Sequence, residues 1–278
     1  MEFTTAFIGP GTMAEAMIAG LLNKGVTEPG KIIAAGPRRE RLNELASRYA
    51  IHTTTENPAA ARQADLVVLS VKPQVLAKVL PELRGKIRPD ALVLSIVAGA
   101  TIPHLAAELE HEAIVRAMPN TPAQIGMGIT VWTASEAVTD TQRHLAERVL
   151  AALGETVFME DEVYLDMATA LSGTGPAYVF LFMEALVDAG VHLGFPRRVA
   201  EKLVVQTVKG SAAYYERQQG EVHLAHLRNQ VTSPGGTSAA ALYYLEKAGF
   251  RTAISRAVWA AYERALSLAQ NGKPQPPK

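Results

Sequence analysis

The chain has 278 residues, of which 48% are hydrophobic and 19% charged, a balance typical of folded globular proteins. At about 150 residues per domain, this length predicts two domains. Lys and Arg total 27, as do Asp and Glu, so the formal charge is zero and a nucleic-acid binder is not expected; the absence of cysteine excludes disulfides and thiolate chemistry.

The first residues predict a cytoplasmic protein, because they lack the basic start and apolar stretch of a signal peptide. The longest apolar stretch, 176–193, carries Glu184 and Asp188. A bilayer span needs about 20 predominantly apolar residues, and two carboxylates inside the stretch argue against one. We therefore expect no membrane-spanning segment.

The first half of the chain alternates short apolar runs with segments of helical spacing. We predict strands at 3–8, 32–35, 65–71, 91–97, 114–117, 128–132 and 156–159, and helices at 13–22, 39–49, 75–83 and 142–153. Near-continuous apolar strands that alternate with helices are typical of parallel strands buried on both faces. Residues 1–160 are therefore predicted to form a doubly wound α/β domain.

Beyond about residue 161 helical spacing dominates, at 177–193, 197–217, 238–248 and 254–269. We predict an all-helical second domain over residues 161–278. In the first of these helices the strongly polar residues Glu184, Asp188 and His192 form one thin stripe, so the helix should be buried nearly all round. A bundle centre and a dimer interface both satisfy this requirement.

Residues 9–14, Gly-Pro-Gly-Thr-Met-Ala, have the form G-x-G-x-x-A between the first predicted strand and helix, which is the context of a dinucleotide-binding fingerprint. Gly9 would form the tight turn, Gly11 would let the backbone approach the pyrophosphate, and Ala14 would let the helix pack on the strand. N–H groups at the helix start would face the phosphates. The alternative is a glycine-rich turn that serves packing alone.

The residues after the second predicted strand bear on the choice of coenzyme. An NAD site usually has Asp or Glu there, whereas this chain has Gly36, Pro37, Arg38 and Arg39. Arginine can pair with a 2′-phosphate, so we predict NADPH as the coenzyme, with NADH less preferred. The alternative is a solvated first helical turn, although the helix dipole disfavours cations there.

No metal site is predicted. The seven histidines are scattered, and no carboxylate or third histidine stands at ligand spacing beside His223 and His226. The sequence also contains no G-x-S-x-G elbow and no Walker loop. Hydride transfer to an electrophilic centre needs few metal ligands or nucleophilic side chains, because the coenzyme supplies the chemistry.

A segment of the second half, Ser233-Pro234-Gly235-Gly236-Thr237-Ser238, places small and hydroxylated residues just before a predicted helix. Bare backbone N–H groups and two hydroxyls at a helix N-terminus make a carboxylate site. The alternative is an ordinary loop in which Thr237 or Ser238 caps the helix.

Five segments, taken in order, resemble those of the pyrroline-5-carboxylate reductases and span nearly the whole chain: 7–13, 70–73, 118–122, 171–178 and 231–237. The resemblance implies reduction of the C=N bond of 1-pyrroline-5-carboxylate to L-proline by NAD(P)H, the last step of proline biosynthesis. It implies a Rossmann domain followed by a helical dimerisation domain. It also implies a homodimer or a higher assembly of dimers, and so favours the interface interpretation of 176–193.

Motif and resemblance together give the candidate site. The candidate cofactor-binding residues are Ile8, Gly9, Pro10, Gly11, Thr12, Met13, Gly36, Arg38, Arg39, Asn57, Ser70, Val71, Lys72, Pro73, Ala98, Gly99 and Asn120. The candidate substrate-binding residues are Glu162, Thr169, Gln230, Gly235, Gly236, Thr237 and Ser238. Many family members have two threonines after the paired glycines, and here the second is Ser238, whose hydroxyl is assigned a catalytic hydrogen bond to the imine nitrogen.

Two other functions fit parts of the pattern. A β-hydroxyacid dehydrogenase would need a lysine in the helix that enters the second domain, and residues 172–195 contain none. An NADP-binding regulatory protein without turnover would keep the glycine-rich loop but would not need the segment 233–238.

Overall fold

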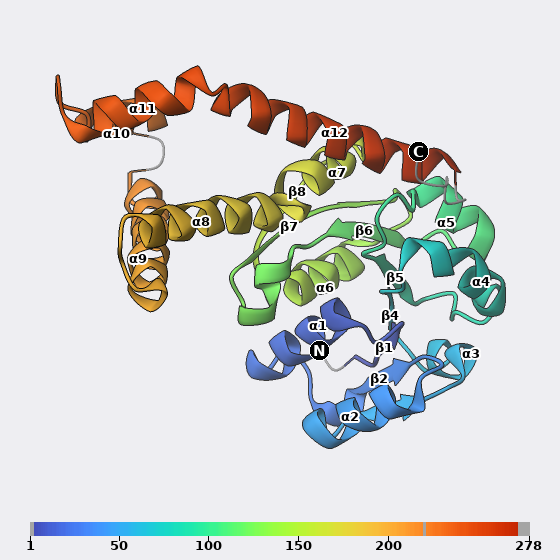
Figure 1. Cartoon of the computed structure of the whole chain (residues 1–278). Helices are drawn as coiled ribbons and strands as arrows, with labels where there is room; N and C mark the ends of the chain where they lie inside the picture. Colours follow the sequence, from blue (N-terminus) through green and yellow to red (C-terminus); the bar gives the residue numbers. More distant parts are fainter. Residues whose placement is uncertain (1–2, 219–220, 272–278) are drawn as a thin grey trace. The chain divides into compact units, whose positions relative to one another are not determined.

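The computed structural model describes residues 3–218 and 221–271 (Figure 1). Its chain packs into two compact units, one formed by Met1–Pro176 with Ala260–Lys278 and the other by Ala177–Trp259. Packing therefore assigns the helical residues just after 161, and the end of the last helix, to the unit that carries the sheet. The sequence-based domain limit after residue 160 stays a prediction.

The first unit is built on an eight-stranded sheet in the order β3-β2-β1-β4-β5-β6-β7-β8. The strands are β1 Thr5–Ile8, β2 Ile32–Ala35, β3 His52–Thr54, β4 Leu66–Leu69, β5 Leu92–Ser95, β6 Ile114–Met118, β7 Gly128–Ala134 and β8 Gly154–Phe158. β1 pairs in parallel with β2 and β4, so Thr5 stands opposite both Ile32 and Leu66. The strand order reverses beside β1, which is the switch point where α/β sheets bind ligands.

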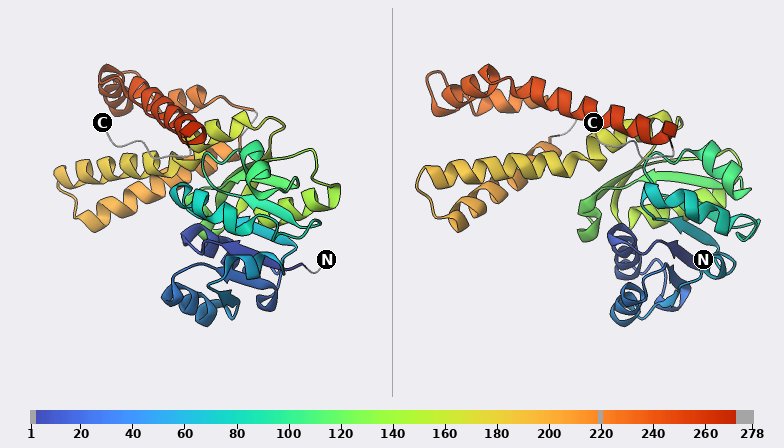
Figure 2. Two further views of the ribbon diagram at one scale, coloured as in Figure 1. Left: turned by 90° about the vertical axis from the view of Figure 1, so that its right-hand side faces the viewer. Right: turned by 45° about the vertical axis from the view of Figure 1, so that its right-hand side comes forward.

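Helices cover both faces of this sheet, as Figures 1 and 2 show. Buried side chains of α1 (Thr12–Asn23), α2 (Arg39–Tyr49) and α6 (Asp140–Ala151) form one core. Those of α3 (Asn57–Ala61), α4 (Pro73–Leu83) and α5 (Ile102–Leu109) form the other. Every residue of β1, β2, β4 and β5 is buried, which explains why these strands are nearly continuous apolar runs.

The expectation that the strands are all parallel is wrong for β7 and β8, because β7 runs antiparallel to β6 and β8 runs parallel to β7. Only the nine residues 119–127, which include the short 3₁₀ helix η2 (Thr121–Ile125), join β6 to β7. A parallel connection needs a crossover of about a dozen residues or more. The chain can therefore only turn back beside β6.

The remaining helices are α7 (Val163–Ala168), the π-helical turn η3 (Thr169–Gly173), α8 (Gly175–His192), α9 (Arg197–Glu216), α10 (Leu224–Gln230), α11 (Thr237–Lys247) and α12 (Phe250–Asn271). Among the described residues beyond 161 none lies in a strand, as predicted. α8 and α9 form a hairpin (Figure 2), in which a Cβ on Gly190 would lie 3.0 Å from the Cβ of Ala200.

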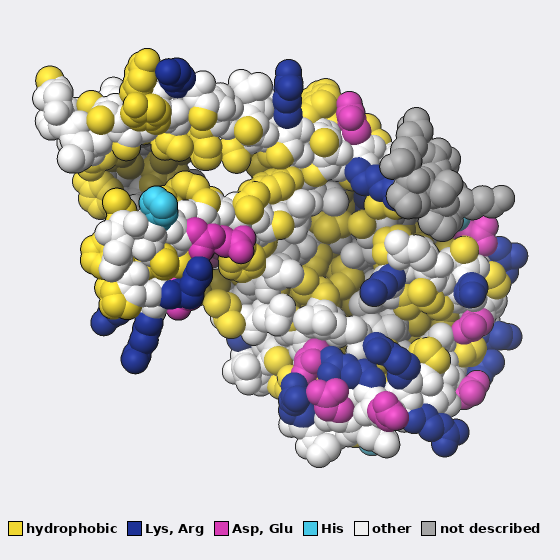
Figure 3. Space-filling model, in the orientation of Figure 1, with side chains coloured by type: hydrophobic (Ala, Val, Ile, Leu, Met, Phe, Trp, Pro, Cys, Tyr) yellow, Lys and Arg dark blue, Asp and Glu magenta, His cyan; other side chains and the backbone are white. Residues whose placement is uncertain are grey.

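The apolar residues of α8 are mostly exposed on the single chain. Val187 is its one buried residue, whereas Phe180 and Leu181 are 61% and 67% exposed. Figure 3 shows hydrophobic side chains gathered over the helices of this unit. Contiguous apolar surface of this kind marks an interaction site, so the single chain does not support the bundle-centre interpretation.

By length and composition alone, the continuous helical stretch Val163–His192 is also apolar enough to cross a membrane, with a mean hydropathy of 1.3. It is the single such stretch in residues 3–218 and 221–271. A helix that packs against other protein passes the same test, so this observation is weak evidence for a span.

Candidate active site

The loop from β1 to α1 has the geometry of a phosphate-binding turn. Gly9 has φ +92°, and a Cβ there would lie 2.5 Å from Cγ1 of Val71, so only glycine fits. At Gly11, which is the N-cap of α1, a Cβ would meet the Gly9 carbonyl oxygen no closer than 4.0 Å. Open space and uncapped N–H groups therefore meet at this helix start, as pyrophosphate binding requires.

The neighbours of the loop hold it in place. Ser70 follows β4 and its hydroxyl donates to the carbonyls of Ile8 and Gly9, at 3.1 and 2.9 Å. Ile8 and Pro10 are buried, Met13 packs against the core beside buried Ala14, and Thr12 is exposed at the start of α1. The loop is thus a rigid surface that presents backbone to a ligand.

Pro10 is held from the side of β2. A Cβ on Gly36 would lie 2.7 Å from Cδ of Pro10, so the residue after β2 must be glycine for the two loops to approach. Arg41 Nε donates to the Pro10 carbonyl at 3.1 Å. Both contacts fix the phosphate loop against the start of α2.

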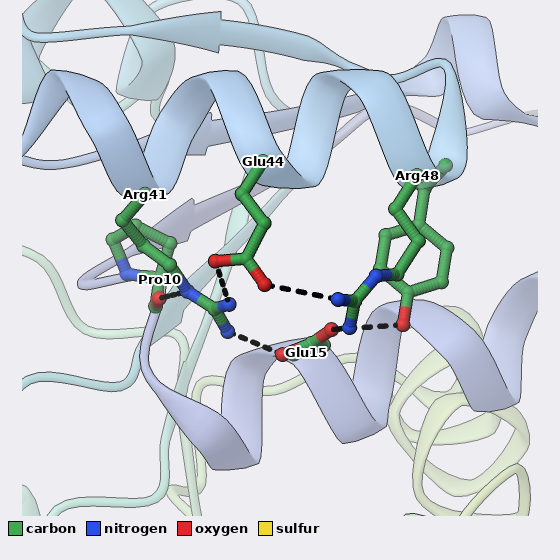
Figure 4. Close-up of polar contacts among 6 residues, drawn as sticks. Pro10, Glu15, Arg41, Glu44 and Arg48 are labelled. Carbon is green, nitrogen blue, oxygen red and sulfur yellow. Dashed lines mark hydrogen bonds and ion pairs between the residues drawn. The ribbon is translucent and has the colours of Figure 1, made fainter.

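Arg41 belongs to an ion cluster that joins α1 to α2 (Figure 4). Glu15 of α1 pairs with Arg41 and Arg48 of α2 and accepts a hydrogen bond from Tyr49 at 3.0 Å. Burial acts to raise the pKa of the Glu15 carboxyl, but hydrogen bonds from Arg41 and Tyr49 and the arginine charges together set that pKa below its ordinary value. Glu15 is therefore ionised at neutral pH.

Neither Arg41 nor Glu15 was among the predicted site residues. A usable signal was present, because a carboxylate in the first turn of α1 and basic residues along α2 face each other when both helices cover one face of the sheet.

The two arginines predicted to bind a 2′-phosphate differ from Arg41 in their placement. Arg38 is the extended N-cap residue of α2, and Arg39 is its first helical residue. Both side chains are exposed. They stand just beyond the carboxyl end of β2, where the ribose of a bound dinucleotide lies, so the residues present fit a phosphorylated coenzyme.

Asn57 opens α3 and offers a second group to the adenosine half of a dinucleotide. Its Nδ2 donates to Glu82 at 3.0 Å. Its Oδ1 is buried and has no hydrogen-bond partner within the described part of the chain. A buried acceptor without a partner is costly, so a donor on the ligand would complete this site.

The residues expected on the path to the nicotinamide follow β4 and β5. Exposed Lys72 is the N-cap of α4 and Pro73 is its first residue. Ala98 and Gly99 are half-buried in the loop after β5. The parallel pairing of β4 with β5 brings these segments to the same edge of the sheet.

Asn120 lies at the end of β6, but its side chain serves the protein. Its Oδ1 accepts from the Ile129 N–H at 3.1 Å, and its Nδ2 donates to the Ser172 carbonyl at 3.2 Å. The amide thus joins β7 to the π-helical turn η3. Thr169 opens that turn, and its hydroxyl donates to the Leu165 carbonyl at 2.7 Å.

Glu162 precedes α7 and lies in an ion-paired position. Its Oε1 accepts from Nη1 of Arg116 at 2.9 Å and from the Ile102 N–H at 2.8 Å. Nη2 of Arg116 pairs with Asp166 at 2.7 Å. Arg116 and Asp166 were not among the predicted site residues, because their partners are far away in the sequence.

The second predicted segment lies in the helical unit. Gly236 is the extended N-cap of α11, and Thr237 and Ser238 are its first two helical residues. No side chain caps this helix start, so the alternative that Thr237 or Ser238 is the N-cap is wrong. Gly235 has φ +72° in the preceding turn, and exposed Gln230 ends α10. The arrangement leaves N–H groups and the hydroxyl of half-buried Ser238 at one helix end.

No group of three or more His, Asp or Glu side chains that could hold a metal ion occurs within residues 3–218 and 221–271. The candidate residues described above suit a dinucleotide and an anionic ligand.

Comparison with known proteins adds a family. Residues 162–268 match the family model described as pyrroline-5-carboxylate reductase dimerisation, and residues 4–99 match NADP oxidoreductase coenzyme F420-dependent. Over 271 residues the chain is 41% identical to pyrroline-5-carboxylate reductase of Synechocystis sp., a match covering 97% of this chain and 100% of that one. The chain belongs to the pyrroline-5-carboxylate reductase family.

Other reductases of this family agree in sequence and in structure. The enzyme of Pseudomonas aeruginosa is 40% identical over 95% of this chain and 96% of its own. The solved structure of the Plasmodium falciparum reductase with NADP bound has a TM-score of 0.88 at 31% identity, covering 96% of this chain and 98% of that one. The Coxiella burnetii reductase has a TM-score of 0.87 at 37% identity, covering 98% and 100%.

More distant structures share the fold alone. Prephenate dehydrogenase of Aquifex aeolicus has a TM-score of 0.54 at 16% identity and covers 91% of this chain and 97% of its own. The predicted class, a Rossmann-type α/β domain followed by an all-α dimerisation domain, is confirmed by the pyrroline-5-carboxylate reductase structures.

Proposed function

We propose that this chain reduces the C=N bond of 1-pyrroline-5-carboxylate to L-proline with NADPH, the last step of proline biosynthesis. One observation carries the proposal: identity of 41% to a named reductase over the whole length of that relative. The rigid loop after β1 and the uncapped start of α11 supply sites for a dinucleotide and for a carboxylate.

NADPH, when bound, supplies the hydride that adds to the imine carbon, while the nitrogen takes up a proton. The chain positions the reactants. Gly9 to Met13 hold the pyrophosphate, and Arg38 and Arg39 pair with the 2′-phosphate.

Backbone N–H groups of Gly236, Thr237 and Ser238 hold the substrate carboxylate, and the Ser238 hydroxyl hydrogen-bonds the imine nitrogen. The further residues proposed to contact the substrate are Glu162, Thr169, Gln230 and Gly235. The further residues proposed to contact the coenzyme are Asn57, Lys72, Ala98, Gly99 and Asn120.

The assembly follows from the helical unit. The match to a dimerisation family model and the exposed apolar face of α8 support a homodimer, or a larger assembly of dimers. The proposed location of the protein is the cytoplasm. We expect this protein to bind neither nucleic acid nor a membrane.

The test is steady-state oxidation of NADPH, then of NADH, with 1-pyrroline-5-carboxylate as the substrate. Turnover with the lower KM for NADPH is the expected result. Turnover that prefers NADH would keep the reaction and remove the role of the arginines. No turnover in protein that binds NADPH would contradict the proposal and favour a regulatory role.

A further inference from the structure

The first unit contains a buried ion network in which only Glu162 has a role in the proposed function, as a substrate residue. Arg116 lies in the middle of β6, and its side chain is 1% exposed. It pairs with Glu162 and Asp166, whose side chains are 25% and 9% exposed. These three residues are named the Arg116 triad below. Arg116 Nε is buried without a partner among the described residues. The side-chain contacts of the guanidinium are therefore those of its two terminal nitrogens with the two carboxylates.

The triad reaches the loop that follows β5, residues 96–101, named here the β5–α5 loop. The Glu162 oxygen that accepts from Arg116 also accepts from the N–H of Ile102, the first residue of α5. Thr101 is the N-cap of α5 and its side chain makes no capping bond. Glu162 therefore takes over the capping role, and its negative charge is favourable at the positive end of the helix.

Other hydrogen bonds of the loop lie near its start. The Ile96 N–H donates to the Leu69 carbonyl of β4 at 3.0 Å. The Val97 N–H donates to Oγ of Ser95 at 3.3 Å, and the Ala100 N–H donates to the Val97 carbonyl at 3.2 Å. In the β-sheet register Ser95 stands directly beside Arg116. The loop is thus fixed at its start by β5 and at its end by Glu162, and Ala98 and Gly99 lie between these two points.

A buried ion network is a poor device for stability alone, because well-packed apolar side chains of similar volume serve at least as well. A guanidinium adds a defined orientation, since its N–H groups donate well only to carboxylates that lie near its plane. Here the oriented carboxylate is that of Glu162, which accepts a hydrogen bond from the N–H of Ile102.

We propose that the Arg116 triad is a positioning device for the coenzyme: it holds Glu162 on Ile102, and so fixes Ala98 and Gly99 where the nicotinamide half must lie. This inference rests on the proposed dinucleotide function. It assigns Glu162 to the coenzyme loop, and direct contact between Glu162 and substrate becomes the competing outcome. The phosphate loop after β1 binds the other half of the coenzyme and does not depend on the triad.

The experiment compares two ligands on full-length protein: NADPH, and 2′,5′-ADP, which has the adenosine half but no nicotinamide. In Glu162→Ala the dissociation constant for NADPH should rise about tenfold, as for a displaced binding element. The dissociation constant for 2′,5′-ADP should stay at the wild-type value. Glu162→Gln should restore most of the NADPH affinity, because its amide oxygen can still accept from Ile102.

Arg84→Ala is the matched control. Arg84 also pairs with α5, but at Glu108 near the far end of the helix and in solvent. Neither dissociation constant should change in this variant.

If Glu162→Ala raised the dissociation constants of both ligands equally, the inference would be overturned, and the triad would contribute to general stability instead. Unchanged NADPH affinity with a raised KM for 1-pyrroline-5-carboxylate would overturn it in favour of direct substrate contact. If the wild-type protein did not turn over substrate, the proposed function would fail, but the ratio of the two dissociation constants would still decide the role of the triad.

If Glu162→Ala does not fold, amide hydrogen exchange in Glu162→Gln replaces it. A neutral acceptor binds the Ile102 N–H less tightly than a carboxylate does. Peptides that span 96–104 should then exchange faster than in the wild type, and peptides from β1 to α2 should not. Unchanged exchange over 96–104 would overturn the inference.

Discussion

Arg38 and Arg39 stand beyond the carboxyl end of β2 with exposed side chains, whereas Arg41, two residues further, is bound to Pro10 and Glu15. Three arginines that are close in sequence therefore have two different tasks. The pair at the helix start can reach a ligand, and the third holds the loop that binds it.

Replacing Arg38 and Arg39 together by alanine should raise the KM for NADPH about tenfold or more, because charge-assisted bonds to the 2′-phosphate are lost. The KM for NADH should stay unchanged, since NADH lacks that phosphate. Steady-state kinetics with both coenzymes gives the ratio. Arg88→Ala, which removes an arginine paired with Asp65 and Asp90, is the control and should change neither KM.

Ser238 occupies the second helical position of α11, where its hydroxyl stands beside uncapped N–H groups. Ser238→Ala should lower kcat/KM for 1-pyrroline-5-carboxylate about tenfold, because one hydrogen bond to the reacting nitrogen is lost. The affinity for NADPH, measured by fluorescence titration, should not change.

Ser47→Ala, on the exposed face of α2, is the control for a lost serine hydroxyl. Wild-type kinetics in Ser238→Ala would remove Ser238 from the mechanism and leave the N–H groups as the substrate contact.

At the scale of elements, the ion cluster around Glu15 fixes α2 against α1 and so sets the distance between the arginines and the phosphate loop. The pKa of Glu15 is lower in the folded protein than in the unfolded chain. Its stabilising contribution is therefore complete above the unfolded value, about 4.3, and is lost as the pH falls through the lower folded value.

Glu15→Gln should lower the Tm at pH 7 by about 2–4 °C, the scale expected for a partly exposed ion cluster in a chain of this size. The difference from the wild type should begin to shrink below the unfolded pKa of about 4.3 and disappear as the pH falls through the lower folded pKa, because the wild-type carboxylate then becomes protonated as well. Calorimetry across this range measures the effect. Glu40→Gln, in the exposed first turn of α2, should change the Tm at neither pH.

Elements with a strong local pattern were predictable. The strand Ile32–Ala35 and the helix Arg39–Tyr49 have the bounds that the sequence predicts. The sequence missed β3, of three residues, and α3, of five, because segments this short contain too few positions to show a period. The helix α5 was also not predicted. The N–H of its first residue donates to Glu162, which lies 60 residues further along the chain.

At the scale of the whole molecule, one unit has two buried cores on its sheet and the other exposes much of its apolar surface. A chain that leaves Phe180 61% exposed on an 18-residue helix is incomplete by itself. The predicted partner for this face is a second copy of the chain.

Phe180→Glu should lower the mass measured by sedimentation velocity to that of the monomer or of a weakened dimer, because burying a charge at an apolar interface is costly. NADPH binding should persist, since the loop after β1 lies entirely within the first unit. Gln63→Glu makes the same change of charge on an exposed residue of that unit and should leave the mass unchanged. An unchanged mass in Phe180→Glu would place the interface elsewhere.

The sequence by itself determined the features that depend on a few consecutive residues: the strand–helix alternation, the turn that only Gly9 can make, and the small residues before Ser238. It also determined the family through motifs of this kind. Only the tertiary structure decided that β7 turns back beside β6, that Arg41 holds Pro10, and that Arg116 directs Glu162 to Ile102. Each of these joins residues that no local period relates, and the partner of a strand edge or a buried charge is fixed only when the sheet brings distant segments together.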